Sequence, residues 1–433
     1  MISASTEKCL NRRKQRKQRK LRGSRAFIAL FPLFSSVGFL LSSSPLQAEE
    51  FRLRDGDRVV LIGSTLIERE QESGYWETAL TSRFPKSNVT FRNLGWSGDT
   101  VFCDARAMFE SPAVGLQHLK EDLARLKPTV ILVGYGMNES FEGESGLLNF
   151  QKGLASLLDM LASTKARIVL ISPPPQEKSG SRLPDPTKHN QDIKLYSETL
   201  RSEAQKRGFF FLDLFTQLLA EAQTPTYRPL TDNGIHFTDF GYWRTSQLLE
   251  QMLVGSARSW RVDMDKDGTT NKVRGASRLF NIRSDPVRFE ALDKELPIPV
   301  PPLQAGTKKT PYPDNARVFR VARLHWKYSL QIDGREVATA SNEEWDKGVP
   351  LIGGPEFDQV EKLRQTIIEK NRFFFHGWRP QNETYIYGFR KHEQGQNARE
   401  IPEFDPLIVQ LEKKIAQLRV PLPHQYELTS NDQ

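Results

Sequence analysis

Five short apolar runs recur between residues 56 and 254, and longer amphipathic stretches separate them. The runs are continuous and rich in branched or aromatic residues, which is the pattern of strands buried on both faces. They are RVVLIG (58–63), NVTFRNL (88–94), TVILVGY (129–135), ARIVLIS (166–172) and FFFLDL (209–214). This half of the chain therefore predicts five strands of one sheet.

The stretches between the runs place apolar residues three or four positions apart, as amphipathic helices do. They lie at 67–84, 115–127, 146–162, 193–208 and 242–253. Strands that alternate with helices predict an α/β fold of three layers, a parallel sheet with helices on both faces. Because ligands bind such sheets at the carboxyl ends of the strands, candidate chemistry is expected just after each run.

The pattern changes after residue 254. Residues 255–350 predict a β-rich segment, in which Asp333-Gly334 has the composition of a hairpin turn. The proline-rich stretch 295–313 predicts a linker or irregular loop. Helical patterns follow within about 355–418. We expect a domain over 49–254 and a smaller C-terminal extension, 255–433, whose helices pack back on that domain.

The net charge of +8 is concentrated at the N-terminus. Residues 1–48 hold ten Lys or Arg and one acid, so the remainder has 51 basic and 52 acidic residues. A basic run followed by a short apolar stretch predicts a signal peptide over 1–48 and export to the periplasm or the cell exterior. An uncleaved anchor is the alternative, and only then would the membrane be a partner. The local charge gives no reason to expect a nucleic-acid partner.

Three strand ends offer groups suited to acyl transfer. Ser64 and Thr65 follow the first strand, where a hydroxyl near helical N–H groups can act as a nucleophile. Gly98, in SGDT, lets its backbone approach a ligand. Asn138, in GYGMN, carries a side-chain amide that could join the Gly98 N–H in holding an oxyanion.

Two histidines are candidates, one for catalysis and one for substrate binding. His236, in LTDNGIHF, is a candidate general base, with Asp232 or Asn233 to orient it. His189 and Asn190 lie in the proline-rich stretch after the fourth strand and are candidates for substrate binding. For Asn190, helix capping is the alternative role.

Taken in order, these segments resemble the SGNH, or GDSL-like, esterases and lipases over roughly 56–253. GST stands in register with the Gly-Asp-Ser block, SGDT supplies the second-block glycine, and GYGMN contains Gly-x-Asn. The resemblance implies a flavodoxin-like sheet and ester hydrolysis without a metal or organic cofactor. It places Gly98 and Asn138 in an oxyanion hole and makes His236 the base. The later sequence, including residues 373–407, resembles the long C-terminal extensions of certain exported bacterial proteins of this kind.

Two departures from the family pattern bear on activity. Thr65 stands at the nucleophile position and Ser64 at the aspartate position, so either hydroxyl, or neither, is the nucleophile. Asn233 stands where the family has the acid three residues before His236, and Asp232 is one residue further away. An Asn can hold an imidazole but cannot balance its positive charge. The sequence thus predicts a weak or specialised hydrolase.

The expected substrate is a small-molecule or glycan ester, and a sugar-linked acetyl group fits the family analogy. The alternative hypothesis is a catalytically impaired module that binds a glycan or a partner in the cell envelope. The sequence contains no pattern that fixes the oligomeric state.

Overall fold

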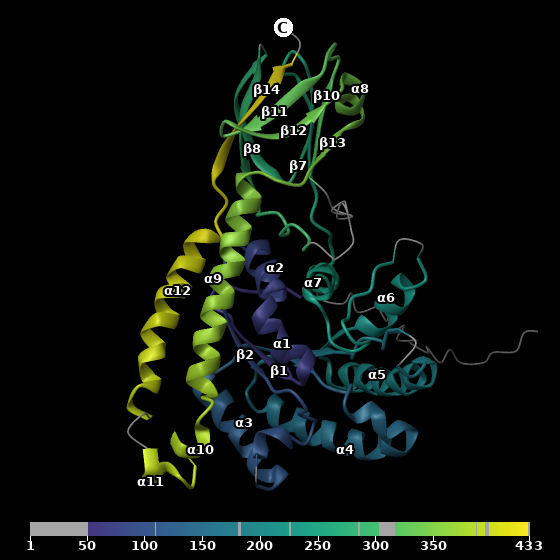
Figure 1. The fold of residues 1–433 in the computed structure, drawn as a ribbon, viewed down its shortest axis with the longest axis vertical. Coiled ribbons are helices and arrows are strands. Elements are labelled where there is room, and N and C mark those ends of the chain that lie inside the picture. The colour runs from purple at the N-terminus through teal and green to yellow at the C-terminus, as the bar shows by residue number, and fades with distance from the viewer. Residues whose placement is uncertain are drawn as a thin grey trace, which may run out of the picture. The chain divides into compact units, whose positions relative to one another are not determined.

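In the computed structural model, five parallel strands form a sheet in the order β2-β1-β3-β4-β5 (Figure 1). All five predicted strands are confirmed. They are β1 (Arg58–Gly63), β2 (Thr90–Gly95), β3 (Val130–Gly134), β4 (Arg167–Ile171) and β5 (Phe210–Leu212). This is the flavodoxin-like strand order.

The structure describes residues 51–431 except 109, 181–182, 225–226, 285, 303–316, 387 and 395–397. The predicted signal peptide, 1–48, lies outside the described residues. In the part of the chain that is described, no helix combines the length and apolarity needed to cross a membrane.

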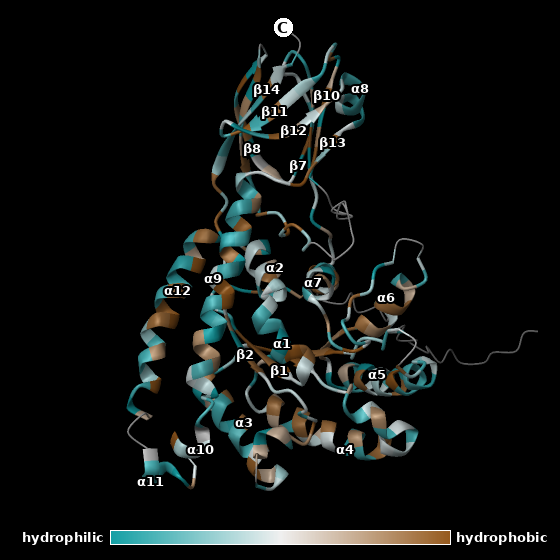
Figure 2. Ribbon diagram, in the orientation of Figure 1, coloured by the Kyte–Doolittle hydropathy of each residue, from teal (hydrophilic) through white to brown (hydrophobic). Residues whose placement is uncertain are grey.

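The strands are buried on both faces because their side chains alternate between two apolar cores. In β1, Val59 and Leu61 join one core, and Val60 and Ile62 join the other. The helices that cover the first face are α1 (Thr65–Ser73), α2 (Tyr75–Arg83), α6 (Leu214–Glu221) and α7 (Asp239–Val254), and those on the second are α3 (Pro112–Leu126), α4 (Gly143–Ala162) and α5 (Thr187–Arg207). Figure 2 shows the central strands in hydrophobic colours. The three-layer α/β fold is thus confirmed.

Two helices differ from the sequence prediction. The stretch 67–84 forms two helices because Gly74 adopts a left-handed conformation, with φ of 65°, between α1 and α2. The buried Glu70 carboxylate then accepts a hydrogen bond from Trp76 N at 2.7 Å, at the start of α2. Helix α6 was not predicted, since its short apolar run merges with the preceding strand.

The extension contains two further sheets, ordered β13-β10-β6-β7 and β12-β11-β14-β9-β8. Their strands are β6 (Trp260–Asp265), β7 (Thr270–Arg274), β8 (Ala276–Ser284), β9 (Val287–Asp293), β10 (Arg317–Ala322), β11 (Tyr328–Ile332), β12 (Arg335–Ala340), β13 (Val349–Leu351) and β14 (Pro423–Ser430), with α8 (Asn342–Lys347) before β13. Both sheets contribute to one apolar core around Phe319 and Tyr426. Asp333 and Gly334 have positive φ angles, as the predicted hairpin turn requires.

The helical part of the extension is α9 (Pro355–Trp378), α10 (Glu383–Ile386), α11 (Lys391–Gln394) and α12 (Phe404–Leu418). Helix α9 packs against α12 and also against α1, α2 and β2 (Figure 1). Lys370 of α9 donates to both carboxylate oxygens of Glu77 in α2, at 2.8 and 2.9 Å, and both side chains are buried. The helices therefore pack on the α/β domain, as the sequence predicts.

Part of the proline-rich stretch is described, and it packs on the α/β domain. Trp243 in α7 donates its indole N–H to the carbonyl of Pro299 at 2.8 Å. Residues 303–313 of the predicted linker lie outside the described residues.

Candidate active site

One pocket contains four of the predicted site residues: Ser64, Thr65, Asn138 and His236. The other lining residues are Leu66, Arg69, Met137, Pro174, Ile235, Phe237 and Tyr242. The cavity has a volume of about 30 Å³, so it is small for a ligand site. Its walls come from segments just after β1, β3 and β4 and from the loop before α7 with the start of that helix, at the expected edge of the sheet.

The two candidate hydroxyls stand at the junction of β1 and α1. Ser64 is the buried N-cap residue of α1, and its side chain makes no capping hydrogen bond. Thr65 is the first helical residue and is half-buried. The turn packs closely on β3, since a Cβ on Gly63 would lie 2.3 Å from the Gly134 carbonyl oxygen. Within the described residues no hydrogen bond joins either hydroxyl to His236. The two candidate nucleophiles therefore differ mainly in solvent exposure, which is greater for Thr65.

The two predicted oxyanion donors are brought together by a hydrogen bond between their loops. Asn138 Nδ2 donates to the carbonyl of Asp99 at 2.8 Å, which ties the loop after β3 to the loop that contains Gly98. One hydrogen of the Asn138 amide group remains for a ligand. Gly98 is exposed, with φ of 81° and open space beside it. The N–H of Thr65, at the first turn of α1, is a further donor that the helix itself leaves unpaired.

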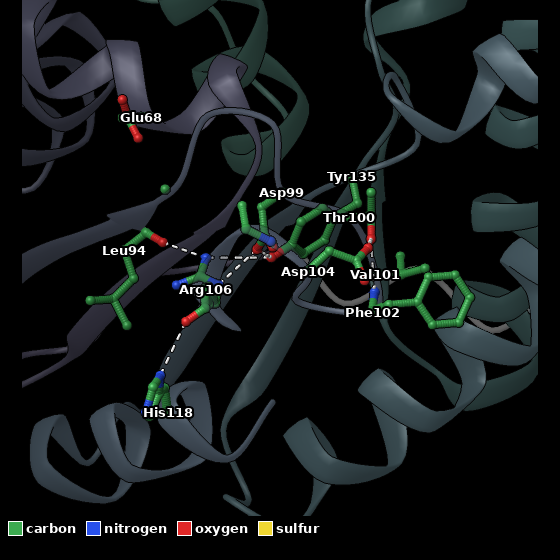
Figure 3. A network of polar contacts seen from close by, with 12 residues as sticks. Glu68, Leu94, Asp99, Thr100, Val101, Phe102, Asp104, Arg106, His118 and Tyr135 are labelled. Atoms are coloured by element: carbon green, nitrogen blue, oxygen red, sulfur yellow. Dashed lines mark hydrogen bonds and ion pairs between the residues drawn. The ribbon is translucent and has the colours of Figure 1, made fainter. Parts of the chain in front are cut away.

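A buried polar network holds the Gly98 loop (Figure 3). Asp99 Oδ2 accepts from Arg106 Nε and from the Tyr135 hydroxyl, both at 2.7 Å. Arg106 Nη2 donates to the Leu94 carbonyl at 2.6 Å, at the end of β2. Burial raises the pKa of Asp99, and Arg106 opposes that change. Asp99 was not a predicted site residue because Gly-Asp is also the composition of an ordinary turn.

The C-terminal extension reaches the same loop. Glu68 in α1 accepts a hydrogen bond from Ser97 N at 2.8 Å, and Arg379 Nη1 pairs with the same carboxylate at 2.7 Å. The Arg379 guanidinium also lies over the Trp96 ring, 3.7 Å from its centroid. The end of α9 therefore packs against the residues that precede Gly98, a contact that no local pattern indicates.

Asn233 contacts His236 through its amide nitrogen. Asn233 Nδ2 lies 3.1 Å from His236 Nδ1, while Asn233 Oδ1 accepts from Ile235 N at 3.1 Å and from His236 N at 2.9 Å. Reversing the amide would place its NH₂ group against two backbone N–H donors, so the backbone fixes this orientation. Nδ1 is therefore an acceptor, and the proton of the neutral ring lies on Nε2.

Asp232, the other candidate for orienting His236, contacts a different partner. Its carboxylate lies 3.2 Å from Arg69 Nη2, and the aspartate side chain is 47% exposed. Only its backbone reaches the histidine, where Asp232 N donates to the carbonyl of His236 at 3.0 Å. Of the two candidates, Asn233 is the one in contact with the imidazole.

The comparisons with known proteins bear on the family and the fold. Residues 63–244 match the model of the GDSL-like Lipase/Acylhydrolase family. These residues form a GDSL-like domain. No curated protein matches the chain.

Solved structures resemble the chain over different lengths. The gut microbial diltiazem-metabolizing enzyme BT4096 is 19% identical, with a TM-score of 0.69 over 88% of this chain and 100% of that one. The α/β hydrolase LAE5, from the metagenome of Lake Arreo in Spain, is 19% identical, with a TM-score of 0.38 over 46% and 96%. The acetylxylan esterase Axe2 from Geobacillus stearothermophilus is 17% identical, with a TM-score of 0.36 over 46% and 95%. The first likeness shows that the fold of the GDSL-like domain together with its extension occurs elsewhere.

Glu177, which sequence reasoning missed, holds the His236 loop of the GDSL-like domain. Its carboxylate accepts from Leu230 N and Thr231 N, each at 2.9 Å, and from the Tyr227 hydroxyl. Glu177 N in turn donates to the Gly234 carbonyl at 2.8 Å. The loop after β4 thereby sets the position of the loop before α7.

His189 and Asn190 of the GDSL-like domain do not line the pocket with Thr65. His189 Nε2 lies 2.8 Å from Ser140 Oγ, and its Nδ1 lies 2.6 Å from Gln176 Oε1. Asn190 exchanges two hydrogen bonds with the backbone of Gln176, at 2.8 and 2.9 Å. Both side chains thus tie the loop after β4 to α5, and neither has a free polar atom aimed into the cavity. Across the described ranges, no group of three or more His, Cys, Asp or Glu could hold a metal ion.

Proposed function

We propose that the protein hydrolyses carboxylic esters, with Thr65 as nucleophile and His236 as general base. The observation that supports this most directly is that Thr65, Asn138 and His236 line one pocket of a GDSL-like domain. Thr65 is preferred to Ser64 because it is the more exposed hydroxyl and stands at the family's nucleophile position. No step of the proposed mechanism uses a metal or organic cofactor.

The proposed reaction has two halves. His236 Nε2 takes the proton from Thr65 Oγ as this oxygen bonds to the acyl carbon. The resulting oxyanion is held by the N–H groups of Thr65 and Gly98 and by the Asn138 amide. Collapse breaks the bond to the alcohol, which leaves with the proton from Nε2. Water then attacks the acyl-threonine by the same route and releases the acid.

Asn233 makes this mechanism slow. A general base needs an unprotonated Nε2, whereas the Asn233 amide favours the tautomer with its proton on that atom. Only the minor tautomer of the neutral ring can therefore accept the proton from Thr65. We infer a specialised hydrolase of modest rate rather than a fast general esterase.

The cavity restricts the acyl group of the proposed substrate. The cavity is small, about 30 Å³, and its walls include Met137, Ile235 and Phe237, which favours a short acyl group. We propose an acetyl ester of a sugar or small molecule, met in the periplasm or outside the cell after removal of residues 1–48.

The test combines active-site labelling with kinetics on p-nitrophenyl acetate. A fluorophosphonate is expected to modify Thr65. Thr65→Ala and His236→Ala should each lower kcat/KM about a hundredfold, less than in an intact triad because Asn233 already limits the base. Ser64→Ala should remain within a few-fold of wild type. Full activity in His236→Ala, or labelling elsewhere, would overturn the mechanism.

The proposed base also predicts a pH dependence. Burial lowers the pKa of His236 below its usual 6.5, Arg69 lowers it further, and Asp232 opposes both. The base must be neutral, so kcat/KM should fall as the pH drops through a value below 6.5. Arg69→Gln removes the cation and leaves Asp232, so this fall should move to higher pH.

The control for that pH profile is Arg320→Gln, since Arg320 pairs with the exposed Asp346 in the extension. It should leave the profile unchanged. An unmoved acidic limb in Arg69→Gln would show that a group other than His236 sets the pH dependence.

The second candidate function is binding without catalysis, and the orientation of Asn233 is the observation that favours it. A His236 whose Nε2 carries the proton is a hydrogen-bond donor to a ligand rather than a base. This function predicts that wild type binds an acetylated saccharide but does not hydrolyse p-nitrophenyl acetate above the rate of His236→Ala.

A further inference from the structure

Phe141 is a large aromatic side chain that the fold leaves exposed. Its side chain is 60% accessible to solvent. One face of the ring stacks on the His189 imidazole, with centroids 4.0 Å apart and planes 25° apart. Because Ser140 and Gln176 occupy both nitrogens of His189, the imidazole cannot turn freely. The phenyl ring is therefore held in place on one face while it remains in contact with solvent.

The position of Phe141 relates it to the pocket. It belongs to the short 3₁₀ helix η2 (Glu139–Glu142), for which Asn138 is the N-cap residue, and Phe141 N donates to the Asn138 carbonyl at 3.4 Å. In a 3₁₀ helix, side chains three residues apart lie on the same side, about 6 Å apart along the axis. Asn138 lines the pocket, so Phe141 lies one 3₁₀ turn from a lining residue.

The residues that support Phe141 are also close in the chain to a lining residue. Gln176, which fixes His189, is two residues after Pro174, and Pro174 lines the pocket. The stack of Phe141 on His189 thus bridges the loops after β3 and β4, which are two walls of the site. An alcohol group that projects from an ester in the pocket toward these two loops would meet this stack.

We infer that the exposed face of Phe141 is a stacking platform for a sugar ring of the substrate. This inference rests on the proposed ester hydrolysis and specifies the alcohol as a saccharide. The C–H face of a pyranose is apolar and flat enough to lie on an aromatic ring, whose face carries partial negative charge. A ring already fixed by stacking loses little conformational entropy on binding. His189 then contributes to substrate binding indirectly, through the ring that it supports.

The experiment compares two acetate esters that differ in the alcohol. With partially acetylated xylo-oligosaccharides, Phe141→Ala should raise KM about tenfold and leave kcat within about twofold. With p-nitrophenyl acetate it should change neither by more than about twofold. Phe141→Trp should keep the low KM for the saccharide. Phe389→Ala is the matched control, since Phe389 is 77% exposed in the extension, and it should have no effect.

Binding separates this inference from the proposed function. In the Thr65→Ala background, calorimetry with the same oligosaccharides should show binding that Phe141→Ala weakens about tenfold, whether or not wild type hydrolyses them. Unchanged KM and unchanged affinity in Phe141→Ala would overturn the platform. So would an equal loss with both esters, which would mean that the pocket itself had been damaged.

Discussion

Asn233→Asp is expected to raise kcat/KM for p-nitrophenyl acetate at least a hundredfold. A carboxylate at this position has acceptor oxygens only, so it can accept from the backbone N–H groups and from His236 Nδ1–H together. The ring proton then moves to Nδ1, and Nε2 becomes free to take a proton. The reverse change, aspartate to asparagine in a serine triad, lowers kcat about ten-thousandfold through the wrong tautomer.

Two companion variants show whether this gain acts through the imidazole. Asn233→Asp combined with His236→Ala should lose the whole gain, because the carboxylate then has no ring to orient. Asp232→Asn should give no increase, since Asp232 pairs with Arg69. If Asn233→Asp folds normally and is no faster than wild type, Asn233 is not what limits the base, and the binding function becomes the better reading.

Lys370→Met is expected to lower the free energy of unfolding by about 3–5 kcal/mol, as is typical when one partner of a buried ion pair is removed. Glu77 would remain buried between α2 and α9 without its cation. Burial already raises the pKa of Glu77, and Lys370 is the main group that opposes this. Urea denaturation followed by circular dichroism measures the loss.

Glu77→Gln combined with Lys370→Met is the informative double variant. It removes both charges and should recover much of the stability, because no unpaired charge stays buried. Arg335→Met is the matched control for an exposed pair, with Asp358 as its partner, and should cost less than about 1 kcal/mol. A loss that small in Lys370→Met would mean that this pair does not anchor α9.

The fold could be predicted where the pattern of apolar residues has the period of a strand or a helix. Runs such as RVVLIG leave no polar face, so they fit only the interior of a sheet covered on both sides. The α/β topology then places the residues after β1 and β3 and the loop before α7 at one edge. That is why Thr65, Asn138 and His236 could be grouped in advance, although up to 171 positions separate them in sequence.

The remainder depends on contacts that a local pattern does not contain. Asp99 holds the Gly98 loop through hydrogen bonds from Arg106 and Tyr135, which come close to it only after folding. The direction of the Asn233 amide is set by two backbone N–H groups, so the letters Asn-x-x-His do not reveal the tautomer of the ring. Arg379 contacts the Trp96 ring, although the two residues are more than 280 positions apart in the sequence. Each of these is a long-range or backbone effect rather than a composition effect.

Strand β14 also escaped prediction, because it follows two helices and was not expected to return to the β-rich segment. It lies in the middle of its sheet, between β11 and β9. This sheet therefore stays divided until residues 423–430 take their place in it. A protein that lacked those eight positions would keep the β12-β11 and β9-β8 hairpins but lose the strand that joins them into one sheet.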